Sequence, residues 1–162
     1  MIETLAKQVI NDCQTHGLQL VTAESCTGGL IMASMTDIAG ASSICDRAYV
    51  TYSNNAKEEM LGVRGETLAI YGAVSAETAY EMVTGAAQTL SVPHAAISVT
   101  GIAGPGGGSE QKPVGTVWIG TAVTGMKTLT KGYLFSGDRA SIRHHTIIAA
   151  LEQLHTQING QD

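Results

Sequence analysis

The chain has 162 residues, 44% of them apolar, and a formal net charge of −5, which suits one compact domain with an ordinary core. The negative charge disfavours nucleic acid as a partner, because nucleic-acid binding needs a basic face to displace counterions. No apolar run approaches the roughly 20 residues that span a bilayer, and the start Met1-Ile2-Glu3-Thr4 has no basic signal segment, so we expect a cytoplasmic protein without membrane contact.

Helices and short strands alternate in the first half of the sequence. Apolar residues recur at helical spacing from Ile2 to Cys13, and His16-Gly17 ends that helix. A strand is expected at 18–23, a turn at 24–29 and a second helix at 30–38. The β-branched and aromatic run at 47–52 predicts another strand. Two short helices follow at 56–61, capped by Asn54 or Asn55, and at 65–71.

The second half of the chain begins with a long helix capped by Ser75. Its expected buried stripe consists of Ala79, Met82, Val83, Ala86 and Leu90. An apolar strand at 95–100 leads into a glycine-rich loop, and two strands at 114–123 and 127–135 form a hairpin around Thr124-Gly125. Asp138 caps a last helix that runs to about Gln157. This order predicts one α/β domain over residues 1–162, a three-layer α/β/α sandwich with a mixed sheet and a late antiparallel hairpin.

Cysteine and histidine spacing gives no sign of a disulfide framework or a metal site. Cys13, Cys26 and Cys45 are odd in number and lack CxxC spacing, which fits a reducing compartment. The pair His144-His145 is a poor chelate, since adjacent residues point in different directions on a helix or a strand. We therefore expect neither a metal nor a cofactor.

Two loops are candidates for ligand binding. The first runs from Ala23 to Gly29 (Ala-Glu-Ser-Cys-Thr-Gly-Gly) between a strand and a helix, where free backbone N–H groups attract an anion or a developing oxyanion. The alternative interpretation of this loop is a helix cap with a tight turn. The second runs from Gly101 to Gly108, and it lacks the Walker A ending and the helix that follows a dinucleotide fingerprint. Its position after a central strand favours binding, and a flexible hairpin loop is the alternative.

Two further groups of residues could carry chemistry. Ser42 could be a nucleophile if Lys57 accepted its proton, directly or through Tyr52, although the spacing alone does not show contact. Arg139 and Arg143 lie in the first turns of the last helix, where positive charge opposes the helix dipole. A bound anion would offset that cost. The alternative is a surface pairing with Asp138 or Glu152.

Five motifs follow one another along the chain: Thr-Ala-Glu-Ser-Cys-Thr-Gly-Gly at 22–29, Tyr-Val-Thr-Tyr-Ser-Asn at 49–54 with Lys57, Gly-Ala-Val-Ser at 72–75, Gly-Ile-Ala-Gly-Pro-Gly at 101–106 and Lys-Pro-Val-Gly-Thr-Val at 112–117. Together they resemble one family, the CinA C-terminal domain, which includes stand-alone nicotinamide-nucleotide amidases. The resemblance implies an α/β/α fold, commonly a homodimer. It also implies hydrolysis of nicotinamide mononucleotide to nicotinic acid mononucleotide and ammonia, in pyridine nucleotide (NAD) recycling, by a metal-independent amidase.

The same resemblance implies roles for individual residues. Ser42 matches the nucleophile, Tyr52 and Lys57 match the residues that assist it, and Arg139 matches a phosphate anchor. The expected substrate-binding residues of the two loops are Glu24, Ser25, Thr27, Gly28, Thr100, Gly101 and Gly104. Ser43 and Ser25 remain alternative nucleophiles. A paralogue that binds a nucleotide without hydrolysing it, or that hydrolyses another amide, remains an alternative function.

Overall fold

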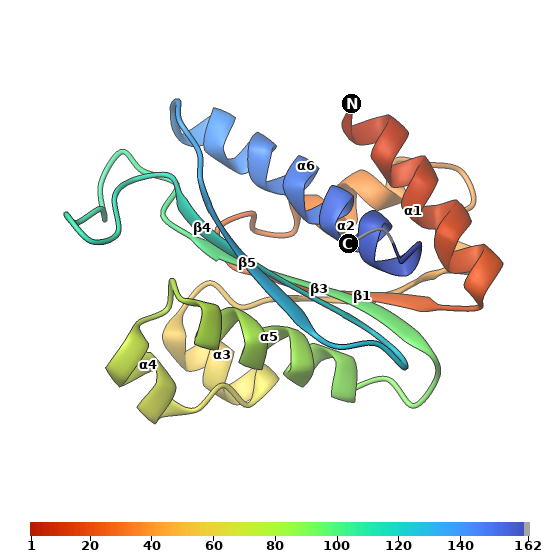
Figure 1. Cartoon of the computed structure of the whole chain (residues 1–162), viewed down its shortest axis with the longest axis horizontal. Helices are drawn as coiled ribbons and strands as arrows, with labels where there is room; N and C mark the ends of the chain where they lie inside the picture. Colours follow the sequence, from red (N-terminus) through yellow and green to blue (C-terminus); the bar gives the residue numbers. More distant parts are fainter. Residues whose placement is uncertain (161–162) are drawn as a thin grey trace.

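The computed structural model describes residues 1–160, so the last two residues of the expected 1–162 domain lie outside the described part. One open sheet lies between two layers of helices (Figure 1). The helices α1 (Ile2–His16), α2 (Leu30–Thr36) and α6 (Arg139–Ile158) cover one face. The other face carries α3 (Asn54–Leu61), α4 (Gly65–Tyr71) and α5 (Ala76–Gln88). The expected three-layer α/β/α sandwich is confirmed.

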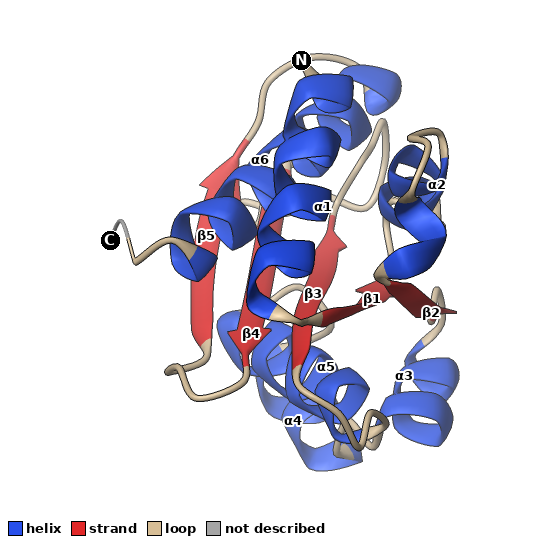
Figure 2. Cartoon of the chain, turned by 90° about the vertical axis from the view of Figure 1, so that its right-hand side faces the viewer, coloured by secondary structure: helices blue, strands red, loops and turns tan. Residues whose placement is uncertain are grey.

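The sheet has the strand order β2-β1-β3-β4-β5 and mixes two directions (Figure 2). The strands β1 (Gln19–Glu24), β2 (Cys45–Val50) and β3 (His94–Gly101) are parallel. The strands β4 (Thr116–Val123) and β5 (Leu129–Leu134) form the antiparallel hairpin that the sequence predicts. β1 lies between β2 and β3, so loops that leave the carboxyl ends of all three parallel strands meet at one edge.

Two aliphatic clusters, one on each face of the sheet, form the core. The larger lies under α1, α2 and α6, and the smaller lies under α3 and α5. The expected stripe on α5 is confirmed for Ala79, Met82, Val83 and Ala86, which are buried, whereas Leu90 is buried but lies beyond the end of the helix at Gln88. Ser75 and Asp138 cap α5 and α6 as expected, because their side chains accept hydrogen bonds from the N–H groups of Thr78 and Ser141. No helix within residues 1–160 has both the length and the apolar character to cross a bilayer.

Three local expectations around β2 need correction. The strand covers Cys45–Val50 and not 47–52, because it pairs with β1 only from Cys45 to Val50 and β1 ends at Glu24. Tyr52 therefore lies beyond the strand. Ser53, and neither Asn54 nor Asn55, caps α3, since its hydroxyl accepts the N–H of Ala56. A short 3₁₀ helix η1 (Ala41–Ser43), which the sequence analysis does not predict, precedes the strand.

Candidate active site

A cavity of about 260 Å³ lies at the carboxyl edge of the three parallel strands. Its walls come from the turn after β1, the residues after β2, the start of α3, the residues before α5, the loop after β3 and the start of α6. The lining includes seven of the expected site residues: Ser25, Tyr52, Lys57, Thr100, Gly101, Gly104 and Arg139. Four others, Ser42, Glu24, Thr27 and Gly28, do not line it.

Lys57 and Ser25 form the chemical centre of this cavity. The Lys57 side chain is only 1% exposed. Its Nζ lies 3.1 Å from Ser25 Oγ and donates to the carbonyl of Thr51 at 2.8 Å and, more weakly, to that of Tyr52 at 3.5 Å. Within residues 1–160 Lys57 pairs with no carboxylate. Burial lowers the pKa of Lys57 from its usual value, because desolvation penalises the ammonium form.

This geometry suits a serine activated by an amine. When Lys57 is neutral, its two N–H bonds can serve the carbonyls of Thr51 and Tyr52, which leaves the lone pair for the proton of Ser25. No three His, Cys, Asp or Glu side chains of the described chain gather in a way that could hold a metal ion. A serine hydroxyl in contact with a buried lysine amine can act as a nucleophile whose base is that lysine.

The structure does not bring Ser42 to Lys57, and the expected contact is wrong. Ser42 lies in η1, before β2, whereas Lys57 follows that strand. A strand of six residues spans about 20 Å. The neighbouring Ser43 likewise lies at the amino edge, where its carbonyl accepts from Gln19 at the start of β1 and its hydroxyl accepts from Gln14 of α1. The two serines are at the opposite edge of the sheet from the cavity.

Glu24 is a structural residue and not the expected ligand contact. Its buried carboxylate accepts backbone N–H groups of Gly29, Ile31 and Met32 at 3.2, 2.9 and 3.1 Å. It also accepts the hydroxyls of Thr22 and Thr27 at 3.1 and 2.7 Å. The N–H groups at the start of α2 are therefore bonded to a carboxylate of the chain itself, that of Glu24, and are not available to a ligand.

The roles expected of Thr27 and Gly28 change for related reasons. Thr27 is buried and its hydroxyl is used by Glu24. Gly28 is exposed, and its φ of +60° belongs to the left-handed region that favours glycine. Both residues shape the turn that carries Ser25, and they do not form the wall of the cavity.

The hydrogen bonds of the buried Glu24 lead to a prediction about the free energy of unfolding. Glu24→Gln is expected to lower the free energy of unfolding by about 2–4 kcal/mol, because one oxygen becomes an NH₂ group that faces other donors. Urea denaturation at neutral pH measures the change. Glu59→Gln, at an exposed position on α3, is the matched control and should change stability by less than about 0.5 kcal/mol. Equal stability of both variants would contradict the role given to Glu24.

The two arginines of α6 use their charges differently. Arg139 lies at the rim of the cavity, where its Nη1 donates to Gly104 O at 2.7 Å and its Nη2 donates to the Tyr52 hydroxyl at 3.0 Å. The Tyr52 ring is 62% exposed, and its hydroxyl contacts Arg139 and not Lys57. The expected proton relay from Ser42 through Tyr52 to Lys57 is therefore not formed.

Arg143 lies one turn further along α6. Its Nε donates to Cys26 O and its Nη2 donates to Thr27 O, each at 3.1 Å. Hydrogen bonds from charged donors contribute about 1.5–3 kcal/mol, which exceeds the dipole cost of about 0.3–1 kcal/mol for a cation at a helix start. The alternative pairing of Arg139 and Arg143 with Asp138 or Glu152 is not observed in the described chain.

The glycine-rich loop forms one wall of the cavity. Gly104 has a φ of +80°, and a Cβ there would lie 2.5 Å from Val114 Cγ1, so a larger residue would push the loop out of place. Thr100 donates its hydroxyl to Ala73 O at 2.8 Å, and Lys112 Nζ donates to Tyr71 O at 2.5 Å. These two bonds join the loop to the segment between α4 and α5, which also lines the cavity.

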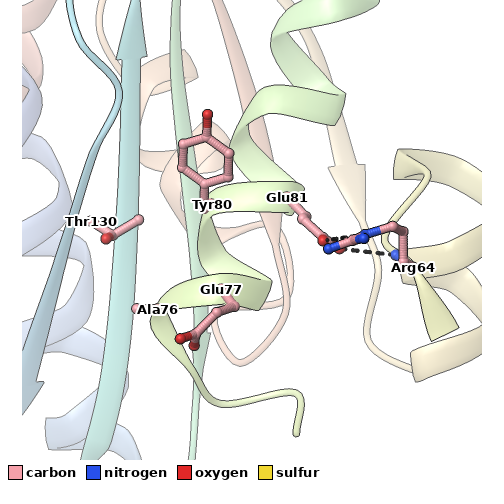
Figure 3. Close-up of a pocket in the computed structure, with 6 residues that line it drawn as sticks. All are labelled: Arg64, Ala76, Glu77, Tyr80, Glu81 and Thr130. Atoms are coloured by element: carbon pink, nitrogen blue, oxygen red, sulfur yellow. Dashed lines mark hydrogen bonds and ion pairs between the residues drawn. The ribbon is translucent and has the colours of Figure 1, made fainter. Parts of the chain in front are cut away.

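A second cavity of about 360 Å³ lies between α5 and β5 (Figure 3). Arg64 and Glu81 face each other there, with Arg64 Nε donating to Glu81 Oε1 at 2.9 Å. The other lining residues are Ala76, Glu77, Tyr80 and Thr130. The arginine is already paired, and no nucleophile with a neighbouring base lines this cavity, so we assign the chemistry to the cavity at the strand ends.

A family model matches nearly the whole chain. The model described as the CinA C-terminal domain matches residues 2–158. The chain belongs to the CinA C-terminal domain family. The resemblance seen in the sequence motifs is thereby confirmed over nearly the whole chain.

Curated relatives within the family fall into a short and a long class. The nicotinamide-nucleotide amidohydrolase PncC of Escherichia coli K12 is 47% identical over 153 residues, which cover 94% of this chain and 92% of that protein. PncC of Enterobacter agglomerans is 50% identical, over 86% of this chain and 84% of that protein. A putative competence-damage inducible protein of Caldanaerobacter subterraneus is 45% identical over 98% of this chain, which spans only 38% of that protein.

Solved structures of CinA-family proteins have the same fold. The competence/damage inducible protein CihA of Agrobacterium tumefaciens superimposes with a TM-score of 0.93 at 47% identity, covering 98% of this chain and 95% of that one. A CinA superfamily protein of Klebsiella pneumoniae gives the same TM-score of 0.93 at 34% identity, with 99% of each chain covered. The fold assignment therefore does not depend on a single relative.

Proposed function

We propose that this CinA-family chain is a nicotinamide-nucleotide amidase that hydrolyses nicotinamide mononucleotide to nicotinic acid mononucleotide and ammonia. The contact between Ser25 Oγ and the buried Nζ of Lys57, at 3.1 Å, carries the proposal for the chemistry. The substrate is supported by the similarity to the PncC amidohydrolases over 94% of the chain. Ser25 thus replaces Ser42 as the proposed nucleophile.

The first half of the reaction forms an acyl-enzyme. Neutral Lys57 accepts the proton of Ser25, and Ser25 Oγ attacks the carboxamide carbon of the substrate. The N–H of Cys26, the residue after the nucleophile, donates to no oxygen within residues 1–160 and is the proposed donor to the oxyanion. Lys57 then gives its proton to the amide nitrogen, the C–N bond breaks, and ammonia leaves.

The second half releases the acid. Water attacks the acyl carbon while Lys57 accepts its proton, and the bond to Ser25 Oγ breaks as that oxygen regains a proton from Lys57. Each proton that Lys57 accepts is returned within the cycle, so the enzyme ends in its starting state. Ammonia release from nicotinamide mononucleotide by the purified chain, with a chelator present, tests this function directly. A chain that binds the nucleotide but releases no ammonia would contradict it.

Arg139 is the proposed anchor for the phosphate of the substrate. Its guanidinium reaches the rim of the cavity, and a planar fork suits two phosphate oxygens. Arg139→Ala is expected to raise KM for nicotinamide mononucleotide about 10- to 100-fold, while activity on nicotinamide riboside, which lacks the phosphate, changes much less. Steady-state ammonia release with both substrates measures the difference. An equal loss for both compounds would remove Arg139 from phosphate recognition.

The alternative of a nucleotide-binding module without hydrolysis is less well supported. A buried lysine without a carboxylate partner is costly for a fold, and a pure binding protein gains nothing from placing it against a serine hydroxyl. Hydrolysis of a different amide stays an alternative, which a panel of carboxamides tests. The homodimer, the cytoplasmic location and the absence of a nucleic-acid partner stay predictions.

A further inference from the structure

We infer that Arg143 is a positioning residue for the reaction, because it holds the turn that carries Ser25 and the N–H groups next to it. The inference rests on the proposed function, in which Ser25 is the nucleophile. Arg143 does not line the cavity, whereas Arg139, one helical turn earlier, does. Its effect must therefore pass through the turn and not through the substrate.

The hydrogen bonds along the turn leave one peptide plane for Arg143 to fix. At the start of the turn, Ser25 N–H donates to Val99 O of β3 at 3.0 Å. At its end, the N–H of Gly29 donates to the Glu24 carboxylate. Between these points the carbonyl of Cys26 accepts a single hydrogen bond in the described part of the chain, from Arg143 Nε at 3.1 Å.

Because the peptide between Cys26 and Thr27 is trans, the bond from Arg143 to its carbonyl also sets the direction of its N–H. The carbonyl of Cys26 points to the guanidinium, so the N–H of Thr27 in the same plane points the opposite way. A rotation of this plane would strain the preceding plane, which holds the N–H of Cys26 proposed for the oxyanion and whose carbonyl, Ser25 O, accepts the N–H of Gly28 at 3.0 Å. Arg143 Nη2 donates to the next carbonyl, Thr27 O, which also accepts the N–H of Leu30 at 3.1 Å, so the guanidinium fixes the Cys26 plane and reinforces the one after it.

The close packing of the turn against the guanidinium supports the same role. A Cβ at Gly28 would lie 3.7 Å from Arg143 Nη2, which is van der Waals contact, so the guanidinium lies directly beside the turn. The bonds join residues 116 and 117 positions apart, which makes α6 the support of a loop built at the other end of the sequence. Lysine donates from a single nitrogen at the end of a flexible chain, so it would not hold the two carbonyls in a fixed geometry as the planar fork does.

The test measures Arg143→Ala and Arg143→Lys by turnover and by covalent labelling of Ser25 with a fluorophosphonate probe, which needs no nucleotide. We expect kcat and the labelling rate of Arg143→Ala to fall together by about 10- to 100-fold, with KM within about twofold of wild type. Arg143→Lys should lie between the two, and added guanidinium ion should restore part of the activity of Arg143→Ala. Arg47→Ala is the matched control: it also removes a bond to a carbonyl, that of Thr89, and should leave both rates within about twofold.

Each outcome decides for or against the inference. Unchanged kcat and labelling in Arg143→Ala would overturn it, and so would a rise in KM at constant kcat, because the latter indicates a substrate contact. If Arg143→Ala does not fold, Arg143→Lys at an unchanged melting temperature gives the same readout. If wild type is labelled at Ser25 but does not cleave nicotinamide mononucleotide, the proposed substrate fails and labelling still tests Arg143. An active Ser25→Ala variant would overturn both proposals.

Discussion

Ser25→Ala is expected to lower kcat for nicotinamide mononucleotide by about 10⁴- to 10⁶-fold, the loss seen when a serine hydrolase loses its nucleophile. The reason is that Ser25 carries the hydroxyl that the Lys57 amine contacts, at 3.1 Å inside the cavity. The KM of any residual activity should change little, because the methyl group of alanine leaves the walls of the cavity in place. Ammonia release at saturating substrate measures the effect.

Ser42→Ala is the control that the structure supplies for this experiment. Ser42 lies in η1, before β2, at the opposite edge of the sheet from Lys57, and its loss should change kcat by less than about twofold. Each alanine variant removes one serine hydroxyl from the same chain, so the comparison isolates the effect of its position. Loss of activity in Ser42→Ala with an active Ser25→Ala would reverse the assignment made here.

The contrast between these serines shows what the sequence could and could not predict. Periodicity and capping residues located nearly all helices and strands, because burial of one face leaves a direct trace in residue order. The choice of nucleophile required knowing at which edge of the sheet each serine lies. That signal was present in part: Ser42 precedes an expected strand and Lys57 follows it, which separates them by the length of the strand, whereas Ser25 follows a parallel neighbour.

Glu24 and Arg143 show a second limit of the sequence. The turn from Ala23 to Gly29 correctly indicated a site for an anion at the start of a helix, yet the anion is the carboxylate of Glu24 itself. The positive charge of Arg143 in the first turns of α6 correctly indicated a missing partner, yet that partner is a pair of carbonyls and not a ligand. A charge pattern reveals that a partner is needed, and only the folded chain shows whether it comes from within.

Lys57→Met is expected to lower kcat by about 10²- to 10⁴-fold, the range that a general base contributes, while the unbranched side chain keeps most of the packing. In wild type the rate should rise with pH until Lys57 is deprotonated, since only the neutral amine accepts the proton of Ser25. Because burial lowers the pKa of Lys57, this rise should end below the usual lysine value of 10.5. The residual rate of the variant should lack this dependence, and a wild-type rate that stays flat with pH would contradict lysine as the base.

The same variant should separate activity from stability. The lowered pKa of Lys57 means that the unfolded chain binds this proton more tightly, so burial of the ammonium weakens the fold at low pH. The penalty is complete below the folded-state pKa and disappears as the pH rises toward the unfolded value. The urea midpoint of wild type should therefore gain on that of Lys57→Met as the pH is raised, whereas Lys127→Met, at an exposed position, should differ from wild type by a constant amount. Lys57 then costs stability at neutral pH and is retained for the proton it accepts from Ser25. A difference in urea midpoint between wild type and Lys57→Met that stays constant with pH would show instead that the amine is never neutralised within the cavity.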